Sequence, residues 1–165
     1  MDVPYNHDPD AVVPLPGVGE ALDRARSAGI KLGIVTNQRG VALGRISPAQ
    51  LRHVHRRVEE LLGPFDVIVS CPHDVDDGCE CRKPRPGLVL DAARRLGVEP
   101  AACAVVGDSW SDVDAACQAG ATAFLIDRDG TIRAGSDATE IRDGVTVVAD
   151  FAAAVDLMLE RCVAA

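Results

Sequence analysis

Four side chains that bind soft metal ions lie within eleven residues of this chain. They form two short pairs, Cys71 with His73 and Cys79 with Cys81. Three thiolates and one imidazole are a usual closed tetrahedral ligand set for structural zinc. Chance clustering is the alternative, but the spacing and the ligand types agree with each other. The sequence therefore predicts one zinc ion that rigidifies a loop with few apolar residues to pack.

Lys83 follows the predicted zinc loop directly. Its ammonium is a compact point charge of the kind that binds phosphate. A lone lysine is most often a solvated surface residue. Two further segments of the chain carry the residue types of a phosphate or magnesium site, and these favour the phosphate interpretation of Lys83.

The first of these segments ends an apolar run at residues 32–35 and continues with Thr36, Asn37 and a turn that contains Gly40. A hydroxyl, an amide and free backbone N–H groups at the carboxyl end of a strand can form an anion-binding concavity. An ordinary strand-to-helix turn with a capping Thr or Asn explains the same residues equally well.

The second segment follows an apolar run at residues 104–106 with Gly107 and Asp108, and Asp112 comes four residues later. If a helix begins near Ser109, the two carboxylates can point to the same place. Such paired carboxylates suit a hard cation such as Mg²⁺. The alternative is that Asp108 only caps the helix, which leaves Gly107 unexplained.

The 165 residues are 47% hydrophobic and have a net charge of −8, with no basic run. They predict a single domain over residues 1–165, with a hydrophobic core and no nucleic-acid partner. Neither a signal peptide nor an apolar stretch of membrane length is evident, so we expect no membrane partner and a cytoplasmic location. The cysteines outside the zinc set, Cys103, Cys117 and Cys162, lie in apolar sequence and are expected to be reduced core thiols.

Strand and helix patterns alternate after an irregular segment at residues 1–16. Strands are expected over residues 31–36, 66–70, 103–107, 122–126 and 145–148. Helices are expected over residues 17–28, 47–62, 86–96, 112–119 and 150–159. This alternation predicts an α/β fold with a Rossmann-like parallel sheet flanked by helices.

Taken together, the motifs resemble the haloacid dehalogenase-like phosphohydrolases, in particular the small-capped branch that has a zinc loop. Residues 35–38 resemble the second motif of that family, residues 71–84 its zinc loop and third motif, and residues 107–112 its fourth. The resemblance implies a Mg²⁺-dependent, monomeric phosphomonoesterase that acts on a small sugar phosphate or bisphosphate. Histidinol phosphate is an alternative substrate. A catalytically silent zinc-bound domain that binds a phosphorylated ligand or a partner chain is an alternative class.

The resemblance also implies roles for single residues. Thr36, Asn37 and Lys83 would hold the phosphate, and Arg82 would contact the distal part of the substrate. Asp108, supported by Asp112, would bind Mg²⁺, and the zinc would be structural because protein ligands fill all four positions.

One element of the family pattern is missing. In the family, a central apolar strand ends in Asp-x-Asp-Gly-Thr, and its first Asp is the nucleophile. This chain starts at Met1, near the point where that strand would end, so we expect the central first strand to be absent and the chain as given to be inactive or impaired. Its absence would leave two facing strand edges unpaired unless neighbouring strands close the gap.

A similar pattern does occur at residues 124–131, with Asp127 and Asp129 in the positions of the two catalytic carboxylates. These residues are candidates for a relocated nucleophile and acid. An Asp-Gly turn after a strand needs no catalytic reason, however. We therefore expect this strand to lie at the sheet edge, beyond the strand that carries Asp108.

Overall fold

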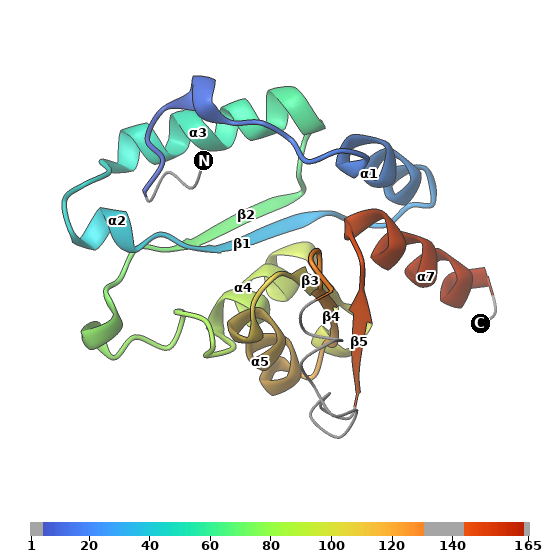
Figure 1. Ribbon diagram of the computed structural model, residues 1–165. Coiled ribbons are helices and arrows are strands. Elements are labelled where there is room, and N and C mark those ends of the chain that lie inside the picture. The colour runs from blue at the N-terminus through green and yellow to red at the C-terminus, as the bar shows by residue number, and fades with distance from the viewer. Residues whose placement is uncertain (1–4, 131–143, 164–165) are drawn as a thin grey trace.

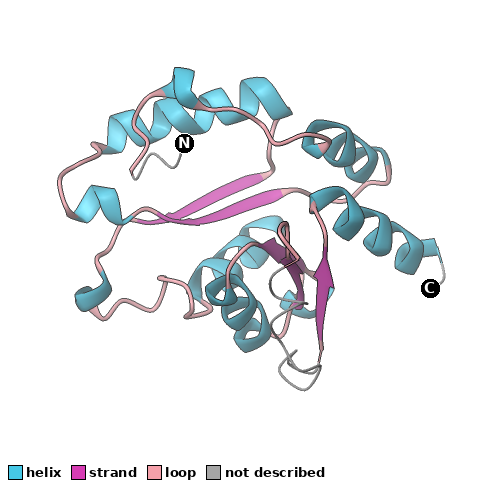
Figure 2. Cartoon of the chain, viewed as in Figure 1, coloured by secondary structure: helices cyan, strands magenta, loops and turns pink. Residues whose placement is uncertain are grey.

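The computed structural model describes residues 5–130 and 144–163, except for the side chains of residues 162 and 163. Strands and helices alternate, and each expected element is present with its ends displaced by a few residues at most (Figures 1 and 2). The strands are β1 (Gly33–Asn37), β2 (Val67–Cys71), β3 (Ala104–Gly107), β4 (Thr122–Ile126) and β5 (Val145–Val148). The helices are α1 (Val18–Ser27), α2 (Arg39–Ala42), α3 (Pro48–Leu62), α4 (Gly87–Leu96), α5 (Trp110–Ala119) and α7 (Phe151–Val163), with short 3₁₀ turns at Pro9–Ala11, Val75–Asp77 and Pro100–Ala102.

The strands form two parallel sheets instead of one. β1 pairs with β2, and β4 lies between β3 and β5. Within residues 5–130 and 144–163, no strand lies between β1 and β3, as expected for a sheet without its central strand. The neighbouring strands have not closed the gap by pairing with each other.

Helices on both faces hold the two sheets together. On one face, α4 packs against β2 through Leu88 and Ala92, and its Val89 joins the core between α5 and β4. On the other face, α1 packs against α7 around Ala25 and Val155. An ion pair between Arg24 and Asp156, 2.8 Å long, adds to the contact between these two helices. Helix packing therefore connects the two sheets.

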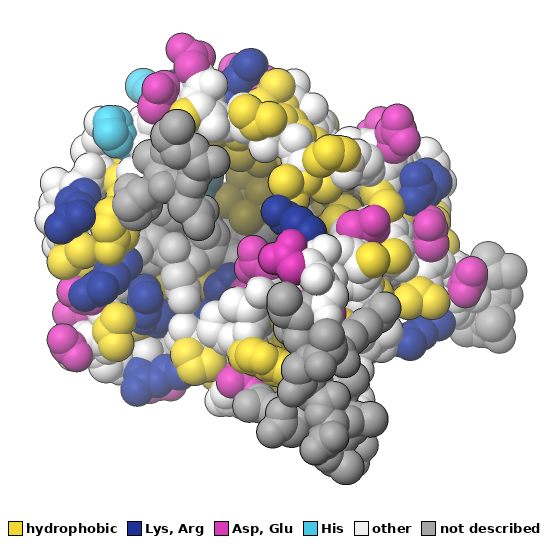
Figure 3. Space-filling model, in the orientation of Figure 1, with side chains coloured by type: hydrophobic (Ala, Val, Ile, Leu, Met, Phe, Trp, Pro, Cys, Tyr) yellow, Lys and Arg dark blue, Asp and Glu magenta, His cyan; other side chains and the backbone are white. Residues whose placement is uncertain are grey.

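The two strands that face the gap are less buried than their outer neighbours. The middle residues of β4, Ala123–Leu125, are fully buried, and buried residues alternate along β2. No residue of β1 or β3 is fully buried, although both strands are apolar. Figure 3 shows the centre of this face hollowed in front of β1 and β2, with hydrophobic side chains on the floor. Apolar strand surface inside the molecule is thus incompletely covered.

The expected core thiols are only partly confirmed. Cys117 is exposed, which makes its prediction wrong, because the side chain lies on the outer face of α5. Cys103 is half-buried, and burial raises the pKa of its thiol. The side chain of Cys162 lies outside the described part of the chain. Among the helices of the described residues, none has the length and hydrophobicity needed to cross a lipid bilayer.

Candidate active site and zinc centre

The four predicted zinc ligands come together in space. Cys71 ends β2 and is fully buried, and the chain returns through a loop that brings back Cys79 and Cys81. The ligand atoms of Cys71, His73, Cys79 and Cys81 all lie within 4.8 Å of one another. This observation confirms that the sequence spacing produces a compact cluster of the right ligand types.

The distances within the cluster fit a tetrahedral zinc ion. The Sγ atoms of Cys71 and Cys79 are 3.7 Å apart, and those of Cys79 and Cys81 are 3.6 Å apart. His73 Nδ1 lies 3.6 Å from the Cys71 sulfur and 3.2 Å from the Cys81 sulfur. Zn–S bonds of about 2.3 Å place two thiolates of a tetrahedron about 3.8 Å apart. The cluster can therefore accept zinc with little rearrangement, through Nδ1 of the histidine.

The thiols of this cluster influence one another. Burial and hydrogen bonds from the neighbouring thiols raise the pKa of Cys81 to about 12. Burial also opposes ionisation of Cys79, but hydrogen bonds from the Arg82 backbone and from the other two thiols outweigh it and lower the pKa of Cys79. Because zinc binds thiolates, loading the cluster must release protons, and zinc affinity must fall as the pH falls.

Three arginines hold the zinc loop in place, in addition to the packing of Cys79 and Cys81 against the core. Arg39 of α2 forms an ion pair with Asp74, which caps the 3₁₀ turn of the loop, and this hydrogen bond lowers the pKa of Asp74. Arg85 donates to the carbonyls of Gly78 and Cys79 at 2.5 Å. Arg82 donates to the carbonyl of His73 at 3.2 Å. The proposed substrate residue Arg82 therefore already has a structural contact.

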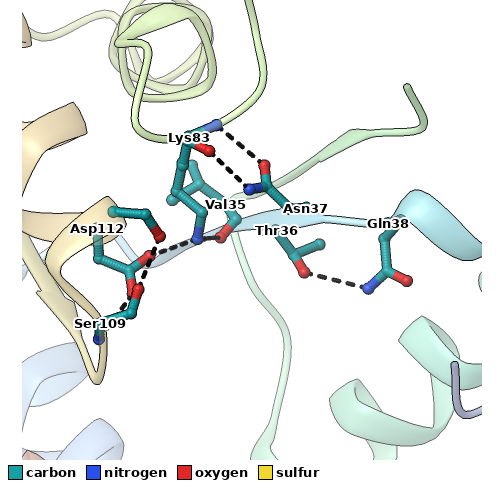
Figure 4. A network of polar contacts seen from close by, with 8 residues as sticks. Val35, Thr36, Asn37, Gln38, Lys83, Ser109 and Asp112 are labelled. Carbon is teal, nitrogen blue, oxygen red and sulfur yellow. Dashed lines mark hydrogen bonds and ion pairs between the residues drawn. The ribbon is translucent and has the colours of Figure 1, made fainter. Parts of the chain in front are cut away.

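The backbone of Lys83 is fixed to the end of β1. Asn37 donates through Nδ2 to the Lys83 carbonyl and accepts from the Lys83 N–H, each at 3.0 Å (Figure 4). This exchange ties the end of the zinc loop to the carboxyl end of the strand. Asn37 thus acts on Lys83 through the main chain. Thr36, next to it, accepts a hydrogen bond from the Gln38 amide at 3.1 Å.

The ammonium of Lys83 lies between β1 and the start of α5. It donates to the Val35 carbonyl at 3.0 Å and to Oδ1 of Asp112 at 2.5 Å (Figure 4). Both side chains of the ion pair are only 11% exposed. Lys83 therefore links the two halves of the structure at the carboxyl ends of β1 and β3.

Asp112 also closes the first turn of α5. Its Oδ2 accepts from the backbone N–H of Ser109 at 3.3 Å and from the Ser109 hydroxyl at 2.6 Å. Ser109 is the N-cap of the helix, so the interpretation of Asp108 as the cap is wrong. Asp108 is instead exposed at the carboxyl end of β3. A Cβ on Gly107 would collide with the Asp112 side chain, which explains why a glycine precedes Asp108.

The relocated nucleophile motif lies away from the gap. β4, which leads to Asp127, pairs with β3 on one side and with β5 on the other. The strand thus lies beyond the Asp108 strand, as expected, but the prediction that it forms the sheet edge is wrong, because β5 pairs with its outer side. Asp127 is 6% exposed, and its N–H donates to the Val148 carbonyl at 2.8 Å. Asp129 is exposed in the following turn.

Comparison with known proteins agrees with this arrangement. The family model for haloacid dehalogenase-like hydrolases matches residues 5–120. The chain therefore belongs to the haloacid dehalogenase-like hydrolase family, which confirms the resemblance seen in the sequence.

Two curated enzymes and one solved structure are similar to this chain over most of its length. The D-glycero-beta-D-manno-heptose-1,7-bisphosphate 7-phosphatase of Bordetella bronchiseptica is 38% identical over 157 residues, which cover 93% of this chain and 87% of that protein. The enzyme of the same name from Pseudomonas aeruginosa is 34% identical over 155 residues, covering 92% and 86%. A crystal structure of the heptose bisphosphate phosphatase from B. bronchiseptica, in complex with magnesium and phosphate, superposes with a TM-score of 0.83. It has 35% sequence identity and covers 94% of this chain and 88% of that chain.

We expect about one zinc ion per chain, as measured by metal analysis of protein purified without chelator. Cys79→Ser should lower the zinc content, because only three ligands remain. Cys117→Ser is the matched control, since this exposed thiol lies outside the cluster, and it should leave the zinc content unchanged. Zinc-free wild-type protein, or equal zinc loss in both variants, would contradict the assignment.

Asp112→Asn should lower the free energy of unfolding by about 3–5 kcal/mol, because it leaves the Lys83 ammonium buried without its counter-charge. Chemical denaturation measures the change. Asp91→Asn removes a more exposed ion-pair partner of Arg94 and Arg95 and should cost about 1 kcal/mol or less. If Asp112→Asn proves too unstable to purify, the double variant with Lys83→Met should recover stability, because both charges are gone. Equal losses of unfolding free energy in Asp112→Asn and Asp91→Asn would contradict a larger contribution of the buried ion pair.

Proposed function

We propose that this chain carries the phosphate-binding and metal-binding half of a phosphomonoesterase site for a small sugar bisphosphate, of the heptose 1,7-bisphosphate 7-phosphatase type. The observation that carries the proposal is the position of Lys83. The zinc loop, Asn37 and Asp112 together hold a buried ammonium at the carboxyl ends of β1 and β3. Ligand sites of open α/β sheets lie at this edge.

A phosphate at this edge would take the Lys83 ammonium and the Thr36 hydroxyl as its principal donors. Asn37 supports it indirectly, because its amide is occupied by the Lys83 main chain. Fixed positive charge in a partly desolvated site stabilises the charge that develops on a phosphoryl group during transfer. Arg82 is proposed for the distal part of the substrate, provided that it can leave the His73 carbonyl.

Asp108 is the proposed direct ligand of Mg²⁺, because its carboxylate is exposed at the end of β3. Asp112 is bonded to Lys83 and to Ser109, so its role in the metal site would be to position these neighbours. Bound Mg²⁺ would neutralise phosphate oxygens and orient the transferred group. The donor set is of the hard oxygen type that Mg²⁺ requires.

Hydrolysis in this family requires a carboxylate nucleophile. β4 is paired on both sides, and this supports a turn role for Asp127 and Asp129. We therefore propose that turnover depends on a segment that supplies the nucleophile next to Lys83, and that the chain as given binds phosphate without efficient turnover. A phosphate-binding domain without catalysis is the alternative function. The pairing of β4 on both sides, which leaves Asp127 in a turn, favours it. We also propose a monomeric protein of the cytoplasm, in keeping with the cysteines of the described residues, which form no disulfide bond.

Phosphate release from D-glycero-D-manno-heptose 1,7-bisphosphate with Mg²⁺ tests the proposal. The chain as given should stay near background, and a chain extended before Met1 by an apolar strand ending in Asp-x-Asp-Gly-Thr should turn over. In the extended chain, Lys83→Met should lower kcat/KM by roughly 10²–10³-fold, because a transition-state cation is lost. Arg94→Met, on an exposed helix face, is the control and should leave kcat/KM unchanged.

Efficient turnover by the chain as given would overturn the assignment of the nucleophile, and Asp127→Asn would then show whether the relocated motif supplies it. An extended chain that binds phosphate but releases none would favour the silent binding domain.

A further inference from the structure

Both ends of the zinc loop are bound by one short segment, the junction between β1 and α2. Where the loop begins, the Cys71 carbonyl accepts from the N–H of Gln38 at 2.7 Å. Where it ends, the main chain of Lys83 exchanges two hydrogen bonds with the side chain of Asn37, each at 3.0 Å. Because Asn37 and Gln38 are neighbours, the loop leaves and returns at the same point of the fold.

The first residue of α2 adds a charged contact to this junction. The Arg39 guanidinium donates through Nε to Oδ1 of Asp74 and through Nη2 to Oδ2, the latter at 3.4 Å. Two such contacts fix the orientation of a carboxylate as well as its distance. The N–H of Ala42, also in α2, donates to the Pro72 carbonyl at 3.1 Å (Figure 1). The start of the loop is thereby held on α2 by one side-chain contact and one main-chain contact.

Asp74 is the residue through which the charged contact reaches the metal ligands. It follows the ligand His73 directly in the chain, and its N–H donates to Oδ2 of Asp77 at 2.7 Å. Its own Oδ1 accepts from the N–H of Val75 at 2.5 Å. These bonds form the 3₁₀ turn after which the chain returns to Cys79. The position of Asp74 therefore decides where the two pairs of zinc ligands can meet.

The turn itself gains little from hydrophobic burial, because Val75 is 59% exposed. Zinc binding requires the closed loop, in which the four ligand atoms lie within 4.8 Å of one another. The ion pair between Arg39 and Asp74, 35 residues apart in the chain, requires the same closed loop. Two interactions that need the same ordered state favour each other, and this coupling is reciprocal.

We propose that Arg39 is a positioning residue for the zinc centre, and that its ion pair with Asp74 keeps the loop closed on α2 and slows the release of Zn²⁺. The four ligands decide where the metal binds, and Arg39 decides how long the metal stays. Arg39 acts through Asp74 and is not itself a ligand. The inference concerns metal retention, so it holds whether or not the proposed phosphatase function is correct.

The rate of zinc release to an excess of chelator, measured on the zinc-loaded chain with a zinc-sensitive dye, tests the proposal. Arg39→Met and Asp74→Asn should each release zinc roughly two- to fivefold faster than the wild type, the range of a partly exposed ion pair. Asn can still accept the hydrogen bond of the turn, so Asp74→Asn removes mainly the charge. The double variant should release zinc no faster than either single variant, because each of them already breaks the whole pair.

Two further variants separate the ion pair from a general effect of charge or of folding. Arg39→Lys keeps the charge but loses the two-nitrogen contact, so its release rate should lie between those of the wild type and Arg39→Met. Arg45→Met removes a neighbouring positive charge whose guanidinium stacks on the Tyr5 ring at 5.2 Å, and it should release zinc as the wild type does. Cobalt(II), bound in place of zinc, should give the absorption bands of a tetrahedral thiolate site in every variant.

Release rates of Arg39→Met or Asp74→Asn equal to that of the wild type would overturn the proposal. So would additive effects in the double variant, or equal acceleration by Arg45→Met. Loss of the cobalt bands in Arg39→Met would also overturn it, because the cluster itself would then have been lost. None of these readouts measures turnover, so their failure is distinct from a failure of the proposed function.

Discussion

The buried contact of the Lys83 ammonium with the Val35 carbonyl and the Asp112 carboxylate links the parts of this molecule that carry the proposed function. It joins β1 of one sheet to the helix that follows β3 of the other. Both side chains of the ion pair are only 11% exposed, so removing one charge leaves the other buried and unpaired, which destabilises the fold. It also places a positive charge at the edge of the sheets where ligands of α/β proteins bind.

Several other features serve this contact. The zinc cluster fixes the loop that leads to Lys83, Asn37 binds the main chain of the lysine, and Gly107 leaves room for Asp112. Arginine contacts with backbone carbonyls add to the packing of Cys79 and Cys81 against the core in holding the zinc loop. The metal cluster therefore contributes to the proposed function by orientation, at a distance from the reacting groups.

Much of this architecture can be predicted from the sequence, because the signals are local. Hydrophobic periodicity predicts the strands and helices, and ligand spacing predicts the Cys71 and His73 cluster with Cys79 and Cys81. The role of Asn37 and the salt bridge of Asp112 could not be predicted in this way. Both depend on contacts between residues far apart in the chain, 46 residues for Asn37 with Lys83 and 29 residues for Lys83 with Asp112. Asp108 and Asp112 look equivalent in sequence, and only the backbone of α5 shows that Asp112 belongs to the cap.

A crystal structure of the zinc-loaded chain, soaked with inorganic phosphate and Mg²⁺, is the most direct test of the central claim that Lys83 is a phosphate ligand held ready by its surroundings. The account predicts a phosphate oxygen at hydrogen-bond distance from the Lys83 ammonium and from the Thr36 hydroxyl, with the metal ion on Asp108. A phosphate bound elsewhere, with the ammonium still on the Val35 carbonyl and Asp112, would contradict it.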